Sequence, residues 1–226
     1  MKFILIASTG RSGSTTLQRI INTIPESNIT GEKMNAITNI LECYKNLKLT
    51  IKKSYGQIQN ERKIFYTYEE LIEKKIKLCF YNSFDFENVK LIIQKLIIEI
   101  LDNKNDNRIL GFKEIRYFDY SKEISLEILN EFMELFPNTK IICHIKNDIT
   151  AQSKSAWFNE DKDSEKNLKN YNKSVKDYVS KNGDFAYLST FENMFNYKEI
   201  EKLFEFLEEK AISKEDYNNI INNNYE

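Results

Sequence analysis

The sequence predicts an α/β fold of three layers, in which helices cover both faces of a central parallel sheet. Four short apolar runs, at residues 3–7, 108–115, 140–145 and 185–188, alternate with stretches of helical spacing. Short apolar runs without polar alternation are typical of strands buried on both faces. Strands that alternate with helices indicate parallel pairing. A polar turn with two glycines directly follows the first run, as in α/β folds that bind ligands at the carboxyl ends of their strands.

Apolar side chains at helical spacing mark the helices. The first helix is expected to be capped by Ser14 or Thr15 and to run to about Thr23. Further helices are expected at 34–47, 69–80, 87–101, 125–136, 148–158, 168–179, 197–208 and 213–221. The polar stretch 48–62 gives no clear pattern. We expect one domain over residues 1–226, with a helical insertion at about 32–101.

Composition narrows the class of protein. Lys and Arg number 33 and Asp and Glu number 34, a balance that argues against a nucleic-acid-binding protein. The longest apolar runs fall short of the roughly 18 residues of a membrane span, so no membrane association is expected. The apolar start is too short for a signal peptide. These features, with an odd number of cysteines, favour a cytoplasmic protein.

Metal binding is not expected from the sequence. The chain has three cysteines and one histidine, His144, and the cysteines are far apart in the sequence. Zinc sites usually place such ligands in close pairs. We therefore predict no metal site.

The turn after the first apolar run, residues 10–16, combines a cation with small residues. Arg11 supplies a fixed positive charge, and Gly10 and Gly13 allow close approach of a ligand to the backbone. Four hydroxyls come from Ser12, Ser14, Thr15 and Thr16. Because a helix N-terminus attracts anions, this turn is predicted to bind a phosphate-like group. It differs from the G-x-x-x-x-G-K-S/T phosphate loop, since no lysine follows Gly13.

The stretch RSGSTTL, residues 11–17, resembles the 5′-phosphosulfate loop of the sulfotransferase family, especially its bacterial and Golgi-type members. Three further stretches strengthen the resemblance: KIICHIKNDITAQSKSAWF at 140–158, GFKEIRY at 111–117 and FENM at 191–194. The resemblance extends from about residue 3 to 207. It implies transfer of a sulfuryl group from 3′-phosphoadenosine 5′-phosphosulfate (PAPS), leaving PAP, to a hydroxyl or amine. Such a transfer does not require a metal.

The resemblance also assigns roles to the donor-binding residues. Arg11 would contact the 5′-phosphate and the bridging oxygen, and Gly13 would give access to the loop. The backbone N–H groups of 12–15 would bind the same group, with the hydroxyls of Ser14, Thr15 and Thr16. Lys146, where the family usually has arginine, would hold the 3′-phosphate. A serine on the following helix, Ser153 or Ser155, would assist it, and we prefer Ser155 because Ala-Trp-Phe follows.

Two candidates exist for the base that removes the acceptor's proton. Glu32 lies where glutamate-dependent members of the family place their base, shortly after the first helix. His144 corresponds to the histidine type, although its place inside a strand is more typical of a packed side chain. We favour Glu32. Lys113 or Arg116 would stabilise the sulfuryl oxygens or recognise an acidic acceptor.

The acceptor would be a small molecule, a carbohydrate or a peptide, and the insertion at 32–101 would form the acceptor side of the site. The sequence gives no indication of oligomeric state. Two other functions stay open. One is a nucleotide or small-molecule kinase with an altered phosphate loop, which would need ATP and magnesium. The other is a non-catalytic nucleotide-binding module of the same fold.

Overall fold

The structure is a computed structural model. It describes residues 1–51, 55–59, 62–75, 84–102, 106–115, 117, 126, 128–155, 158 and 162–222. The chain divides into two compact units, Met1–Asn35 with Ile98–Glu226, and Ala36–Ile97. The second unit falls within the insertion expected at 32–101. That the whole chain acts as one domain stays a prediction.

The first unit is built on a five-stranded parallel sheet with the order β2-β5-β1-β6-β7. Its strands are β1 (Lys2–Ser8), β2 (Ser27–Thr30), β5 (Ile109–Glu114), β6 (Thr139–Ile145) and β7 (Ala186–Thr190). The four expected strands are confirmed, with shifted ends. The expectation of four strands was nevertheless wrong, because β2 adds a fifth at the sheet edge. Only Ile29 of this short polar strand is buried, so it lacks the apolar run by which the others are recognised.

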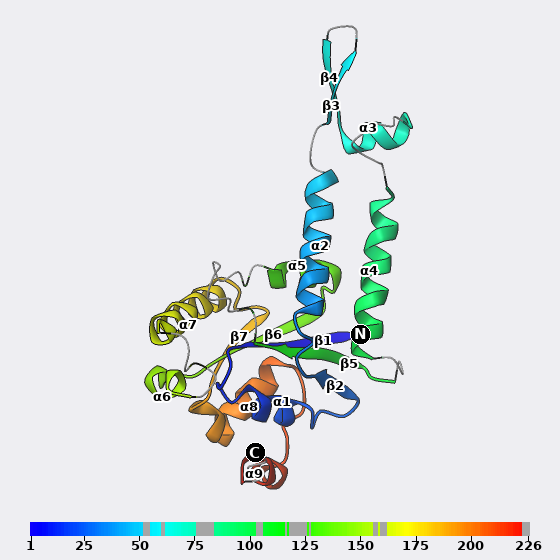
Figure 1. Cartoon of the computed structure of the whole chain (residues 1–226). Coiled ribbons are helices and arrows are strands. Elements are labelled where there is room, and N and C mark those ends of the chain that lie inside the picture. The colour runs from blue at the N-terminus through cyan, green and yellow to red at the C-terminus, as the bar shows by residue number, and fades with distance from the viewer. Residues whose placement is uncertain are drawn as a thin grey trace. The chain divides into compact units, whose positions relative to one another are not determined.

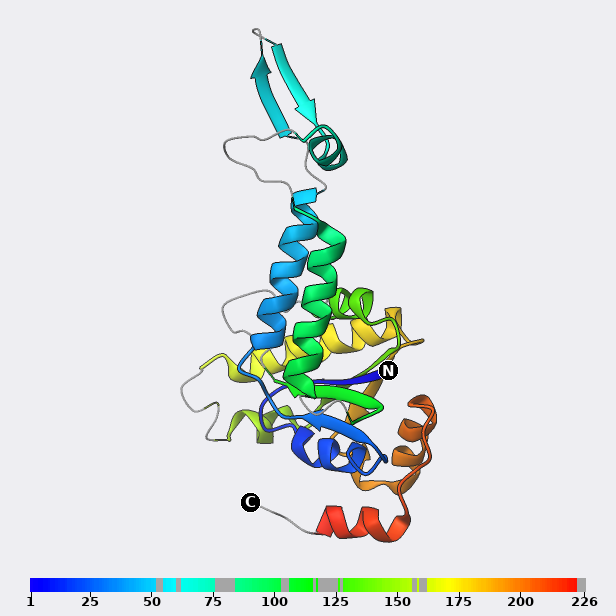
Figure 2. The same ribbon diagram turned by 90° about the vertical axis from the view of Figure 1, so that its right-hand side faces the viewer.

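Helices cover both faces of this sheet, which confirms the three-layer architecture (Figures 1 and 2). Adjacent side chains of a strand point to opposite faces, and β1 shows this directly. Phe3 packs its ring against Phe132 and Phe136 on one face, and Ile4 joins the core that contains Leu17 on the other. The helices α5 (Ile128–Leu135) and α7 (Ser164–Lys181) cover the first face. The second is covered by α1 (Ser14–Ile21), α8 (Tyr197–Phe206) and α9 (Lys214–Asn222).

One helix of the first unit is much shorter than predicted. The helix expected over 148–158 is α6 (Ile149–Ser153), which starts at an Asp148 cap and ends after little more than one turn. Ser155 therefore lies beyond the helix rather than on it. Gln152, on this short helix, turns inward and is buried.

The second unit contains a pair of helices and a hairpin. Its elements are α2 (Ala36–Ile51), β3 (Tyr55–Gln59), β4 (Arg62–Tyr66), α3 (Tyr68–Glu73) and α4 (Phe86–Leu101), the last of which continues into the first unit. The antiparallel pair β3–β4 lies in the stretch that gave no clear pattern. The helix expected at 69–80 is confirmed as far as Glu73, and residues 76–83 lie outside the described part. None of the described helices combines the length and apolar character needed to cross a membrane.

Candidate functional site

The loop between β1 and α1 has an unusual backbone. Arg11 adopts a left-handed conformation with φ 59°, which is uncommon for a residue with a side chain, and Gly13 has φ 83°. Gly13 is the N-cap of α1, and no side chain caps the helix, so the expectation of a Ser14 or Thr15 cap was wrong. The first N–H groups of a helix have no partners within it. These groups can therefore bind an anion.

Buried side chains hold the loop in this conformation. The Ser12 hydroxyl donates to the Thr9 carbonyl oxygen at 2.8 Å, and His144 Nε2 donates to the Ser12 carbonyl oxygen at 2.8 Å. Gln152 donates from its amide nitrogen to Thr9 Oγ1 and to the Gly10 carbonyl oxygen, both at 2.8 Å. A left-handed non-glycine residue costs about 1–3 kcal/mol and persists only where its surroundings impose it. Here β6 and α6 supply those surroundings.

His144 has a structural role in this arrangement. The carbonyl oxygen at Nε2 can only accept, so Nε2 carries the proton and Nδ1 accepts from the Ser189 hydroxyl at 2.9 Å. Complete burial lowers the pKa of His144 to about 4. The ring is therefore neutral near pH 7, and both nitrogens are already engaged. These facts count against His144 as the base, and the role of Glu32 stays a prediction.

Glu32 and Lys113 lie together beside the loop. Lys113 Nζ is 2.6 Å from Glu32 Oε1 and 3.4 Å from Thr15 Oγ1. The side chain of Lys113 is 8% exposed and that of Glu32 is 25% exposed. The pairing of β2 with β5 explains why the two side chains lie together. Glu32 follows the carboxyl end of β2, and Lys113 lies near the carboxyl end of β5. The sequence did not reveal β2. Three expected site residues are thus neighbours.

Lys146 lies on a different side of the loop, against an aromatic ring. Its Nζ is 4.6 Å from the centre of the Phe191 ring. The same ring touches the loop, because a Cβ added to Gly13 would lie only 2.4 Å from Phe191 Cδ2. The backbone N–H of Phe191 donates to the Ile145 carbonyl oxygen at 2.8 Å. The ring therefore contacts both regions that are expected to bind the donor.

The two candidate serines differ in what their hydroxyls do. Ser153 Oγ donates to the Thr150 carbonyl oxygen within α6, at 3.0 Å. Ser155 Oγ is buried and has no hydrogen-bond partner among the residues that the structure describes. Among the described residues, neither serine hydroxyl forms a hydrogen bond with Lys146. An unpaired buried hydroxyl is costly, so Ser155 is the better candidate for contact with a ligand.

The turn after β6 is fixed from two sides. The Asn172 amide donates to the Lys146 carbonyl oxygen at 2.8 Å, and the Glu192 carboxylate accepts from the backbone N–H groups of Asn147 at 2.9 Å and Asp148 at 3.2 Å. A cleft of about 380 Å³ lies beside this turn. It is lined by Asn147, Ile149, Lys169, Asn172, Lys173, Lys176 and Asp177.

Sequence reasoning missed two contacts of the site. Gln152 gives no signal, because a glutamine in an amphipathic helix is usually solvent-exposed. The contact of Phe191 with Lys146 depends on the pairing of β6 with β7, which the FENM stretch alone does not reveal. Arg116, which the sequence analysis named beside Lys113, lies outside the described residues. No group of three or more His, Cys, Asp or Glu side chains in the described ranges could hold a metal ion.

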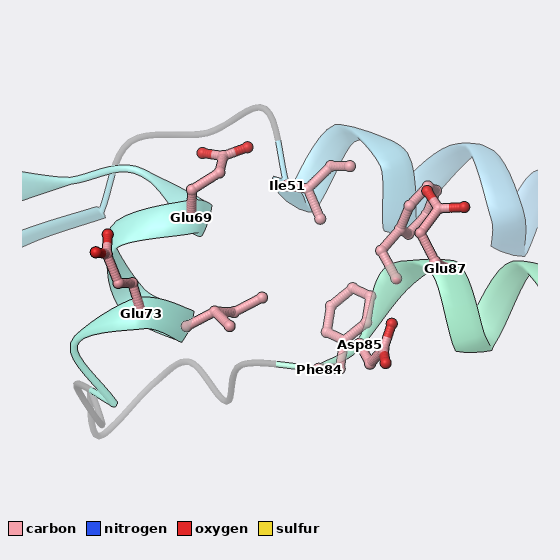
Figure 3. A pocket seen from close by; sticks show the side chains of 8 residues that line it. Ile51, Glu69, Glu73, Phe84, Asp85 and Glu87 are labelled. Carbon is pink, nitrogen blue, oxygen red and sulfur yellow. The ribbon is translucent and has the colours of Figure 1, made fainter.

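The second unit contains a cavity of about 720 Å³ (Figure 3). Its walls are apolar, from Ile51, Ile72, Phe84 and Phe86. Four acidic residues also line it, Glu69, Glu73, Asp85 and Glu87. Figure 3 shows Glu69 and Glu73 on α3, across the opening from Phe84 and the start of α4, with the Glu73 carboxylate turned away from Phe84. A volume of this size suits a small organic group.

No protein-family model and no curated protein sequence matches the chain. Solved structures do match it. The sulfotransferase domain from the curacin biosynthetic pathway has a TM-score of 0.50 and 16% identity, covering 95% of this chain and 76% of that one. The sulfotransferase domain from the Synechococcus PCC 7002 olefin synthase has a TM-score of 0.53 and 14% identity, covering 97% and 77%. At such low identity the likeness concerns the fold. The chain has the fold of the sulfotransferases, as its motifs predicted.

Proposed function

We propose that this protein is a sulfotransferase that moves a sulfuryl group from PAPS to a hydroxyl or amine of an acceptor. One observation carries the proposal. The loop after β1 is held in a strained conformation by buried side chains, and it lies against the Lys113–Glu32 pair. Strain of this kind is concentrated at functional sites. The sulfotransferase fold supports a phosphosulfate as the ligand of this loop.

The residues present fit the donor. The absence of a side chain at Gly13 and the uncapped start of α1 suit a 5′-phosphosulfate, which the N–H groups and the hydroxyls of Ser14, Thr15 and Thr16 would bind. Lys146 and the unpaired hydroxyl of Ser155 suit the 3′-phosphate. The bound donor supplies the sulfuryl group for in-line displacement.

The chain's own groups would provide positioning and charge. Arg11 is exposed at the loop and would stabilise the charge that grows on the bridging oxygen. Lys113 would act on the sulfuryl oxygens from beside Thr15. Glu32 would take the acceptor's proton, and its contact with Lys113 orients the carboxylate.

The acceptor would be a small molecule, a carbohydrate or a peptide. Screening of hydroxyl and amine compounds would identify the acceptor.

The first test is calorimetric titration with PAP in the presence of a chelator, run beside ATP with magnesium. Micromolar binding of PAP without metal, and weak binding of ATP, is expected. Preference for ATP with magnesium would contradict the proposal and favour a kinase. Binding of neither nucleotide would leave a protein that keeps the fold without the donor site.

The catalytic half of the proposal is tested by Glu32→Gln. The substitution keeps the size of the side chain, so PAP binding should be unchanged. Turnover with an acceptor found by screening should fall by about 100-fold or more, as for other positioned catalytic groups. Equal turnover in both proteins would remove Glu32 from the mechanism.

A further inference from the structure

The cation that follows β6 contacts an aromatic ring. Lys113 on β5 and Lys140 on β6 each lie within ion-pair distance of a carboxylate, from Glu32 and Glu208, and Lys140 also lies 4.8 Å from the centre of the Phe206 ring. Within the described residues Lys146 pairs with no carboxylate, and its Nζ lies over the face of the Phe191 ring. The face of an aromatic ring attracts a cation through its quadrupole.

This difference has a direct consequence for anion binding. A carboxylate that holds a lysine offsets part of its charge, and a phosphate would then have to share the ammonium group with that carboxylate. A neutral ring restricts the same flexible side chain without cancelling its charge. Contact with Phe191 is thus suited to a lysine whose charge is reserved for a ligand.

The position of the ring is itself well determined. The Phe191 backbone N–H donates to Ile145, the residue before Lys146, and the ring packs edge-on against Phe195 with centroids 5.0 Å apart. The next residue, Glu192, binds the backbone N–H groups of the turn after β6. These hydrogen bonds fix the backbone that carries the ring, and the contact with Phe195 restricts the ring itself.

We propose that Phe191 is a positioning residue for the 3′-phosphate of the donor, holding Lys146 in place and leaving its charge free. The proposal rests on the proposed function, since it requires a donor with a 3′-phosphate. It makes Phe191 a determinant of specificity, because the lysine that it holds distinguishes PAP from nucleotides that lack that phosphate.

Phe191 also packs against the loop at Gly13. The experiment must therefore separate this packing from the proposed action on Lys146. Phe191→Leu keeps an apolar side chain at Gly13 but removes the aromatic face. Phe191→Tyr keeps the face and serves as the matched control. Each protein is titrated with PAP and with AMP, which differs from PAP only by the missing 3′-phosphate.

We expect Phe191→Leu to weaken PAP binding about threefold to fivefold, the scale of an exposed cation–π contact, and to leave AMP binding unchanged. Phe191→Tyr should bind both nucleotides as the wild type does. In a Lys146→Met background, Phe191→Leu should have no further effect on PAP. This last result would show that the ring acts through the lysine.

Equal weakening of PAP and AMP by Phe191→Leu would overturn the inference, since the ring would then act only on the loop. Unchanged PAP binding in Phe191→Leu would overturn it too. Failure of the wild type to bind PAP would instead contradict the proposed function, and this is seen before any variant is compared. The two failures are therefore distinguishable.

Discussion

The loop after β1 and the turn after β6 follow adjacent strands, yet they are built in different ways. The loop offers backbone N–H groups, and the side chains of His144 and Gln152 hold that backbone in place. The turn offers side chains, the Lys146 ammonium and the Ser155 hydroxyl, and only the lysine has a described partner. A site made of backbone depends on few residue identities within it, whereas a site made of side chains depends on each one. Substitutions can test this contrast.

The largest effect is expected from Gly13→Ala, which attacks the backbone-built loop. An alanine at this position would have to keep φ at 83°, and its Cβ would lie 2.4 Å from Phe191 Cδ2. Strain and overpacking together should destabilise the protein by about 4 kcal/mol and abolish PAP binding. Urea unfolding and calorimetry measure both.

Gly183→Ala is the matched control for that substitution. A Cβ at Gly183 would be 3.9 Å from its nearest neighbour, the Val179 carbonyl oxygen. Stability and PAP affinity should stay close to those of the wild type. If Gly13→Ala were as mild as this control, the loop could not be as constrained as described.

Acid should weaken the same loop through His144. The pKa of the buried ring is about 4, whereas an exposed histidine titrates near 6.5. Below pH 6.5 the unfolded chain therefore takes up a proton that the folded chain does not. The free energy of unfolding should fall between pH 6.5 and 4, by about 3 kcal/mol in total.

The measurement is urea unfolding of the wild type and of His144→Gln at several pH values. The variant is less stable at pH 7, but its stability should decline less steeply toward pH 4 because position 144 no longer titrates. Parallel curves for the two proteins would mean that other groups cause the acid sensitivity.

A smaller loss is expected from Gln152→Met. The substitution keeps the volume but removes the donor to Thr9 Oγ1 and to the Gly10 carbonyl oxygen. Leaving these acceptors without a partner should cost about 2 kcal/mol of stability and weaken PAP binding as the loop loosens. Thr9→Val, which removes only one of the two contacts, should cost less. A neutral Gln152→Met would show that the loop keeps its shape by itself.

The smallest effect concerns the side-chain-built turn. Ser155→Ala should weaken PAP binding about fivefold, equivalent to about 1 kcal/mol, because its buried hydroxyl would lose the phosphate. Ser153→Ala should leave PAP binding unchanged, since that hydroxyl is used within α6. Calorimetry on the pair decides between the serines, and the reverse order of effects would move the 3′-phosphate to Ser153.

The contrast between the loop after β1 and the turn after β6 also explains which features the sequence predicts. The buried strands and the loop were recognisable because their residues are consecutive and their composition reflects local physics. The strand β2 was not, since it is short, polar and stabilised by its pairing with β5. The inward turn of Gln152 arises from tertiary contacts, as does the position of Phe191 on Lys146. Such contacts join distant parts of the chain and leave no local pattern.

The left-handed conformation at Arg11 has a consequence for the thermodynamics of ligand binding. Because buried hydrogen bonds already impose this conformation, the chain loses the conformational entropy of the loop when it folds and not when a nucleotide arrives. The loop is preorganised, and an incoming anion meets N–H dipoles that need no reorientation. Selectivity at this end of the site would then come from rigidity, with an ill-fitting anion rejected because the backbone does not adapt to it.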